Sequence, residues 1–256
     1  MERNKTTSVI GRVNLVFTAA AAVIALLLTV KYLAVYILVG SMKPLMCFGA
    51  CLLWLLLLSF LLYKGACRHN FALVILESFA ILFWLLFVTA YSPMVNSDSM
   101  WRYTFQRKYI SCYGKTSCDY MPDTLPEGIS DYRFFYRPTI MQGTGNNFLR
   151  FVADDALVDE YISEYSKEAI YTRPLSDFKR DCIIFIDKVS PKAESISDTF
   201  EGRALALRYD EKFWGDDVDN ATVFFTYAYH DYNHPSSSAV IIDKNTNKVE
   251  FAHFGG

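Results

Sequence analysis

Two histidines near the carboxyl end, His230 and His234, flank Asp231 in the pentapeptide HDYNH. The spacing matches the H-E-x-x-H zinc pattern, in which a helix presents both histidines on one face and offers a carboxylate as base. Pro235 follows at once and a strand-like run, FFTYAY, precedes the pentapeptide, which predicts a loop in place of that helix. The three residues are therefore a weak metal site, and a metal-dependent hydrolase centred on them is an alternative hypothesis.

His253 shares strand parity with Val249 and Phe251, which predicts a buried, hydrogen-bonded histidine and not a third ligand. The acidic run GDDVDN, with Asp216, Asp217 and Asp219, lacks the later bidentate acid of a calcium loop, so a solvated loop is expected. Asn220 opens a glycosylation acceptor by pattern, Asn-Ala-Thr, which matters only in a eukaryotic secretory pathway. We expect no cofactor, and no pattern in the sequence indicates an enzyme nucleophile.

Glu77 is the one acidic residue inside an apolar segment, and an ionisable group at such a position is a functional candidate. Lys31 lies in an earlier apolar segment, but helix rise places the two at different depths, so we predict that they do not pair. We expect Lys31 to extend outward to the interface and Glu77 to have a structural role at the inner boundary. An ion path through Glu77 is the alternative.

The six cysteines divide between the apolar part and the remainder of the chain. Cys112 and Cys118 lie close together around a glycine, and a disulfide between them is expected in an oxidising compartment. The alternative, half of a zinc site, needs two further ligands nearby, and Cys182 is the only other cysteine in residues 94–256.

Three apolar segments, at about 13–36, 45–63 and 71–91, are each long enough to cross a bilayer as a helix. They form a predicted transmembrane region of residues 13–93 after a short N-terminus of residues 1–12. Lys and Arg gather in that N-terminus and in the second short loop, which indicates that both are cytoplasmic. With three spans, residues 94–256 then lie outside the cytosol, in a bacterial periplasm or a eukaryotic lumen or exterior.

The charge of the chain is unevenly distributed. Residues 1–93 carry seven basic and two acidic residues; the whole chain has 25 and 27, so residues 94–256 have a net charge of −7. An acidic tail is a poor partner for nucleic acid, whose binding depends on neutralising phosphates, and DNA or RNA binding is not expected. The length and aromatic content of the tail predict a folded domain.

Alternating apolar residues predict strands near 131–137, 147–152, 182–187, 203–209, 222–230, 239–243 and 248–254. Asp154 can cap a helix that runs to about Ala169, with Val158, Tyr161 and Tyr165 on one face. The segment DKNTNK reads as the turn of a final hairpin. The fold class expected is therefore a membrane protein with three helices followed by a soluble α+β domain with a mainly antiparallel sheet.

The leading functional hypothesis is a membrane-anchored binding module that acts without catalysis through its extracytoplasmic domain. Abundant tyrosine favours a protein partner or a homo-oligomer, as in a sensor, an assembly factor or an immunity-type inhibitor; membrane lipid is the other expected partner. Three spans before a strand-rich tail resemble, in architecture alone, the matrix and accessory membrane proteins of coronaviruses, whose tails are cytoplasmic. A viral-type accessory protein or a small oligomeric channel that uses Glu77 is the alternative.

Overall fold

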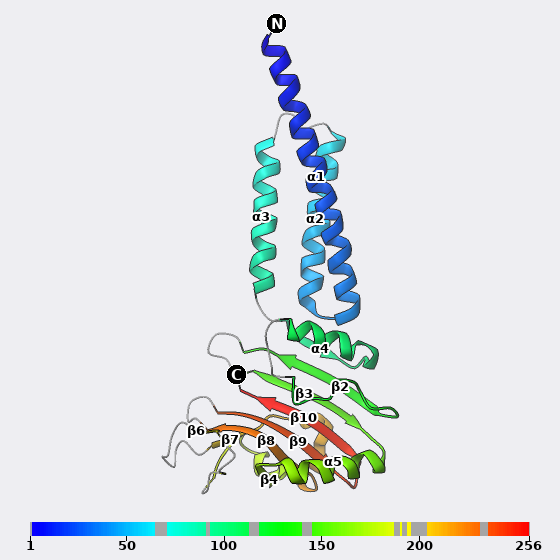
Figure 1. Cartoon of the computed structure of the whole chain (residues 1–256), viewed down its shortest axis with the longest axis vertical. Helices are drawn as coiled ribbons and strands as arrows, with labels where there is room; N and C mark the ends of the chain where they lie inside the picture. Colours follow the sequence, from blue (N-terminus) through cyan, green and yellow to red (C-terminus); the bar gives the residue numbers. More distant parts are fainter. Residues whose placement is uncertain are drawn as a thin grey trace. The chain divides into compact units, whose positions relative to one another are not determined.

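The computed structural model describes residues 2–64, 71–90, 93–112, 118–139, 145–186, 190, 194–195, 204–230 and 235–255 (Figure 1). The chain divides into two compact units, Met1–Ser92 and Pro93–Gly256. Each unit has its own packing and is described by itself below.

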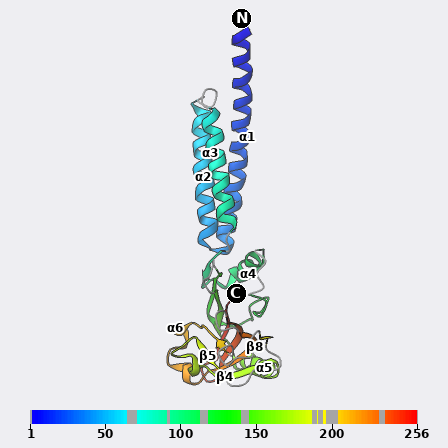
Figure 2. The same ribbon diagram turned by 90° about the vertical axis from the view of Figure 1, so that its left-hand side faces the viewer.

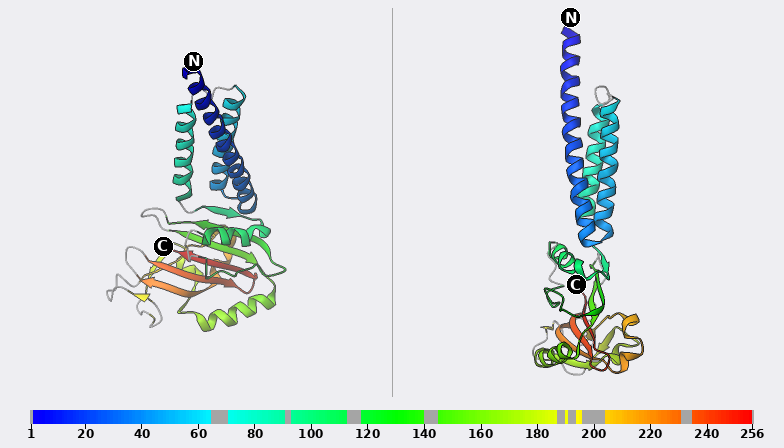
Figure 3. Two further views of the ribbon diagram at one scale, coloured as in Figure 1. Left: turned by 45° about the horizontal axis from the view of Figure 1, so that its top comes forward. Right: turned by 90° about the vertical axis from the view of Figure 1, so that its right-hand side faces the viewer.

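The first unit consists of three helices, α1 (Glu2–Val39), α2 (Met42–Tyr63) and α3 (Phe71–Ala90). A tight turn joins α1 to the antiparallel α2 (Figures 1 and 3). Gly40 makes this turn in the left-handed region, at φ 70°, and its N–H donates to the carbonyl of Tyr36 at 2.8 Å. A glycine in this conformation satisfies a carbonyl at the helix end that would otherwise lack a partner.

Small residues on α1 allow close contact with the neighbouring helices. Ala21 and Ala25 are buried in one cluster with Trp54 and Leu58 of α2 and Val74 of α3. Small side chains let helix backbones approach closely in lipid, where there is no hydrophobic driving force between helices. Trp54 is a packing residue of this cluster, since only 2% of its surface is exposed.

Two helical segments, Gly11–Val39 and Met42–Tyr63, are long and apolar enough to cross a membrane, which indicates a membrane protein. The third predicted span does form a helix, α3, but its continuous apolar stretch in the described residues is the shorter Val74–Leu86. Three spans are therefore not confirmed. Residues 2–12, expected as a separate polar N-terminus, are the first turns of α1, since the helix continues through them without a break.

The second unit is built on an eight-stranded sheet. Its main path runs in the order β1 (Val95–Ser97), β2 (Ser130–Arg137), β3 (Asn146–Val152), β10 (Lys248–Phe254), β9 (Ser236–Asp243), β8 (Thr222–His230) and β4 (Tyr171–Pro174). All neighbours on this path are antiparallel, and β6 (Glu194–Ser195) adds a short parallel pairing to β8. A separate two-stranded sheet joins β5 (Ile183–Phe185) to β7 (Ala204–Ala206). The predicted antiparallel sheet domain is confirmed.

Helical elements cover both faces of this sheet. They are η2 (Met100–Arg102), α4 (Tyr103–Ser111), α5 (Asp155–Glu168), η3 (Leu175–Phe178), α6 (Glu211–Trp214) and η5 (Gly215–Asp219). Figures 2 and 3 show α5 on one side of the sheet and α6 on the other.

Two local predictions are confirmed in detail. The Asp154 carboxylate accepts the N–H of Leu157 at 2.8 Å and so caps α5. The β9–β10 hairpin turns where expected, with Asp243 paired to Lys248, and the Asp243 carboxylate accepts the N–H of Asn245 at 2.9 Å. Both features arise from short polar side chains that hydrogen-bond to nearby backbone, so they follow from local sequence.

The strand register gives the two faces of the sheet different compositions. One transverse row consists of Phe134, Leu149, Phe251, Val240 and Phe224, and we call this side the aromatic face. The adjacent row, on the opposite side, consists of Arg133, Arg150, Glu250, Ile241 and Val223, and we call this side the mixed face.

Each face has its own cover. On the aromatic face, Tyr103 of α4 contacts Phe134 edge-on at 5.4 Å between ring centroids, and Tyr161 of α5 contacts Phe251 in the same way at 5.7 Å. On the mixed face, Leu175, Phe178, Leu207 and Trp214 pack on the sheet residues in one buried cluster.

Candidate functional site

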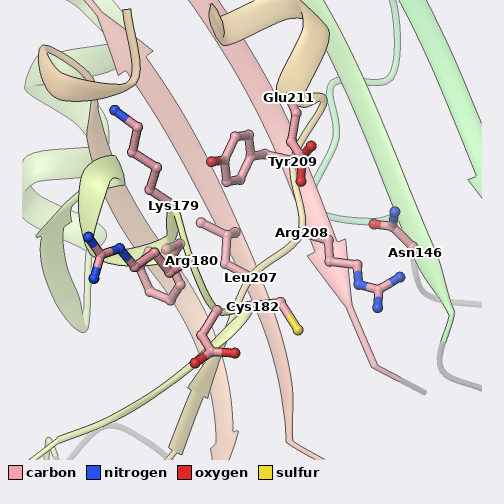
Figure 4. Close-up of a pocket in the computed structure, with 10 residues that line it drawn as sticks. Asn146, Lys179, Arg180, Cys182, Leu207, Arg208, Tyr209 and Glu211 are labelled. Carbon is pink, nitrogen blue, oxygen red and sulfur yellow. The ribbon is translucent and has the colours of Figure 1, made fainter. Parts of the chain in front are cut away.

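A cavity of about 340 Å³ lies on the mixed-face side of the soluble unit. Two segments supply most of its walls: residues 178–182, which begin at the last residue of η3, and residues 207–211, which end at the first residue of α6. The lining side chains are Asn146, Phe178, Lys179, Arg180, Asp181, Cys182, Leu207, Arg208, Tyr209 and Glu211 (Figure 4).

The two walls are joined by main-chain hydrogen bonds. The N–H of Leu207 donates to the carbonyl of Cys182 at 2.8 Å, directly next to the β5–β7 pairing. Leu207 and Phe178 are buried in the core below, so the base of the cavity is apolar. The polar side chains therefore lie on a base that packing holds in place.

The rim of the cavity is locally basic. Lys179, Arg180 and Arg208 are exposed, against two acidic side chains, Asp181 and Glu211. Figure 4 shows Arg180 and Arg208 on opposite sides of Cys182. Since the tail as a whole has a net charge of −7, this rim is a positive spot on an acidic domain. Such a spot favours an acidic group as the ligand.

Tyr209 adds a neutral hydroxyl to the cavity. Burial raises the pKa of Tyr209, and the carboxylates of Glu211 and Glu250 raise it further. The phenol is consequently protonated at neutral pH and can both donate and accept a hydrogen bond.

A buried carboxylate fixes the wall that carries Tyr209 and Glu211. Glu250 of β10 is fully buried, and its carboxylate accepts the N–H of Asp210 at 2.9 Å and the indole N–H of Trp214 at 2.6 Å. Burial raises the pKa of Glu250 to about 8, the Asp210 carboxylate adds to this effect, and the two hydrogen bonds and Arg150 oppose it.

Arginine side chains neutralise Asp210 from the sheet. The Nε atom of Arg150 donates to the Asp210 carboxylate at 2.8 Å, and a terminal nitrogen of Arg133 lies 3.6 Å from the same oxygen. Arg150 also donates to the Asp131 carboxylate at 2.8 Å, and its guanidinium lies 4.5 Å from the ring centroid of Phe213. The network holds α6 against β3 and β10, so the cavity wall is preorganised.

The predicted metal site is only partly within the described residues. His230 is the last residue of strand β8, which confirms that a strand precedes the pentapeptide, while Asp231 and His234 lie outside the described residues. The described part of the chain holds no group of three His, Cys, Asp or Glu residues placed to bind a metal.

The prediction for His253 is confirmed. It is 9% exposed, its Nδ1 lies 3.0 Å from the Ser238 hydroxyl, and the Tyr120 ring stacks on it at 5.5 Å. Burial lowers the pKa of His253 to about 4.

The predicted disulfide is not formed in the structure, which describes both cysteines as thiols. Cys112 is exposed at the end of α4, whereas Cys118 is buried, with 1% of its surface exposed. Proximity in sequence suggested the bond, but the helix end presents one sulfur to solvent while the other packs inside.

The remaining candidates lie apart from the cavity. Lys31 is exposed, with Nζ 5.5 Å from the Tyr32 ring centroid, and no ion pair with Glu77 occurs among the described residues. One carboxylate oxygen of Glu77 is buried in α3 without a hydrogen-bond partner in the described part of the chain. Asn220 is exposed at the end of η5, as a glycosylation acceptor requires.

The acidic run expected as a solvated loop forms the short helix η5. Asp217 accepts a hydrogen bond from Lys248 at 2.6 Å, and Asp219 lies 3.4 Å from Lys179. These acids therefore pair with lysines.

The sequence did not indicate the cavity itself. Residues 177–182, DFKRDC, and residues 207–211, LRYDE, each have mixed charge next to a predicted strand. Neither segment contains a local pattern that predicts their contact. No known protein family, curated protein or solved structure matches the chain.

Proposed function

We propose that this protein is a membrane-anchored binding module whose extracytoplasmic domain binds an acidic segment of a protein partner at the cavity between residues 178–182 and 207–211, without catalysis. The observation that carries the proposal is the pair of exposed arginines at the cavity, Arg180 and Arg208, on an otherwise acidic domain; Lys179 beside them pairs with Asp219. Charge complementarity of this kind gives specificity and speeds association.

An exposed aromatic residue beside the rim supports a protein as the partner. Phe185 of β5 is 51% exposed and lies three residues after Cys182. Aromatic residues and arginine are both enriched in protein interfaces, where they provide most of the binding energy. The preorganised wall behind Tyr209 and Glu211 supports the same function, because a rigid site loses less entropy on binding.

The extracytoplasmic side rests on the distribution of Lys and Arg in the short segments between the apolar helices. The proposed anchor consists of the two helices suited to cross a membrane and of α3 as a third span, because an odd number of spans places the domain opposite the basic N-terminus. A sensor, an assembly factor and an immunity-type inhibitor all fit such a module.

The test is photo-crosslinking in native membranes, with a photoreactive phenylalanine analogue at position 185 of the full chain. We expect a discrete crosslinked product that depends on the rim. The double variant Arg180→Glu/Arg208→Glu should reduce that product about tenfold, which corresponds to about 1.4 kcal/mol of binding free energy.

Lys167→Glu is the matched control, since Lys167 is an exposed cation near the end of α5, on the other side of the sheet. It should leave the product unchanged. Equal yields from the rim variant and the wild type would reject the cavity as the binding site.

A further inference from the structure

The segment formed by η2 and α4 has two distinct sides. Tyr103, Gln106 and Ile110 point into the soluble unit and are each 0% exposed. On the outer side, Met100 is 48% exposed, Trp101 56% and Phe105 45%. Trp101 and Phe105 are four residues apart, so they lie on one helical face. We call Met100, Trp101, Phe105 and Lys108 the outer α4 face.

An exposed cation accompanies the apolar residues on this outer face, whereas Arg107 of the same helix turns inward. Lys108 is exposed one turn after Phe105, and the Arg102 guanidinium lies 5.0 Å from the Trp101 ring centroid. Arg107 instead donates to the carbonyl of Cys118 at 3.2 Å and pairs with Asp123. Lys108 is therefore the exposed cation of this segment, while Arg102 and Arg107 are half-buried.

This combination of residues suits the boundary between lipid headgroups and acyl chains. Tryptophan favours that boundary because its ring is apolar and its N–H is polar, and lysine and arginine favour anionic headgroups. Helices of this composition lie in the interface with the apolar face about 5–10 Å below the headgroup level. The outer face consists of four residues, whereas a stable protein interface involves about 20–30 residues on each side.

The inference rests on the proposed function in one respect, which is that α3 crosses the membrane as the third span. Residues 93–100 separate the start of the soluble unit from Trp101, and eight residues reach at most about 30 Å. A bilayer crossed by α3 would thus be within reach of the outer α4 face.

We propose that the outer α4 face is a membrane-surface docking site, which inserts Trp101 and Phe105 into the headgroup boundary of the bilayer that anchors the chain. The site is separate from the proposed cavity, because α4 covers the aromatic face of the sheet and the cavity lies on the mixed face. It would fix the orientation of the soluble unit at the membrane.

The experiment uses the full chain in lipid nanodiscs that contain brominated lipids, because bromine quenches tryptophan on contact. Subtracting the emission of Trp101→Phe from that of the wild type isolates Trp101. The same subtraction with Trp214→Phe isolates the fully buried Trp214 as an internal control. We expect bromines near the headgroup end of the acyl chain to remove most of the Trp101 emission, bromines near the chain end to remove less, and neither to affect Trp214.

A second variant tests the charged part of the site. Lys108→Glu should reduce the quenching of Trp101 in anionic lipid and leave it nearly unchanged in zwitterionic lipid. Trp101 emission that is equal in brominated and unbrominated lipid would overturn the proposal. Disulfide-linked dimers through the exposed Cys112, found together with unquenched Trp101, would also overturn it and assign the face to a second copy of the chain.

Discussion

The aromatic face of the sheet is packed by rings from α4 and α5, whereas the mixed face buries Glu250 and Asp210 beside its apolar core, with Arg150 paired to Asp210. Apolar contacts tolerate changes of shape because their energy is proportional to area and has no direction. A buried ionic network depends on each partner, since removal of one leaves a charge without compensation. The two faces should therefore respond to mutation and to pH in different ways.

The largest difference is expected between two neighbouring positions on β3. Arg150→Met should destabilise the soluble unit by about 3–5 kcal/mol, because Asp210 stays buried without its nearest cation. Phe151→Met, on the aromatic face, should cost at most about 1.5 kcal/mol, since one large apolar side chain replaces another. Pulse proteolysis of the full chain across a urea series measures both, and equal losses would remove the distinction between the faces.

The second prediction concerns pH. The folded pKa of Glu250, about 8, lies above the unfolded value of about 4.3, so the folded state binds the proton more tightly. Stability from this group is complete below the unfolded pKa and is lost as pH rises through about 8. His253, on the aromatic face, has its pKa lowered to about 4 and acts in the other direction, with stability lost as pH falls below about 6.5.

The range from pH 6.5 to 8 therefore separates the two groups. The unfolding free energy of the wild type should fall there by up to about 1.4 kcal/mol per pH unit. Glu250→Gln should flatten this slope, because its side chain does not titrate, and His253→Gln should leave it intact. Parallel wild-type and Glu250→Gln curves in the same urea assay would show that Glu250 does not titrate in this range.

The smallest change in stability is expected from removing the hydroxyl of Tyr103 in α4 or of Tyr132 in β2, whose rings are in contact. Tyr103 donates to the carbonyl of Pro122 at 2.6 Å, so Tyr103→Phe should cost about 1 kcal/mol. The buried hydroxyl of Tyr132 has no hydrogen-bond partner among the described residues, so Tyr132→Phe should be neutral or stabilising. Thermal unfolding of the two variants side by side would test this, and a larger loss for Tyr132→Phe would contradict it.

The aromatic face follows the sequence more closely than the mixed face. Alternation gave the strands around Phe134 and Phe251, and helical spacing gave the α5 stripe of Tyr161 and Tyr165 that packs on Phe251. Asp154 was identified as the cap because its hydrogen bond closes within three residues. Periodicity and local hydrogen bonds act over short stretches, so one sequence is enough to show them.

The mixed face depends on partners that are far apart in the chain. Arg150 and Asp210 are separated by 60 residues, and Trp214 and Glu250 by 36. A buried glutamate in a strand reads from sequence as a solvent-facing position, and only the fold brings its donors to it. Helix α4 was missed for a different reason: its alternating aromatic and basic residues are compatible with either an amphipathic helix or a strand.

The edge strands of the eight-stranded sheet determine whether copies of this protein can pair through their sheets. At one border, β1 has three residues; at the other, β4 has four and ends at Pro174, which lacks an N–H. A long edge strand with unpaired N–H and C=O groups would allow a strand of another chain to pair with it. Short edge strands, one of which ends in a proline, offer few such groups. In a membrane, where copies of the protein are close together, two neighbouring domains would gain little by joining their sheets. The domains are therefore expected not to aggregate through their sheet edges.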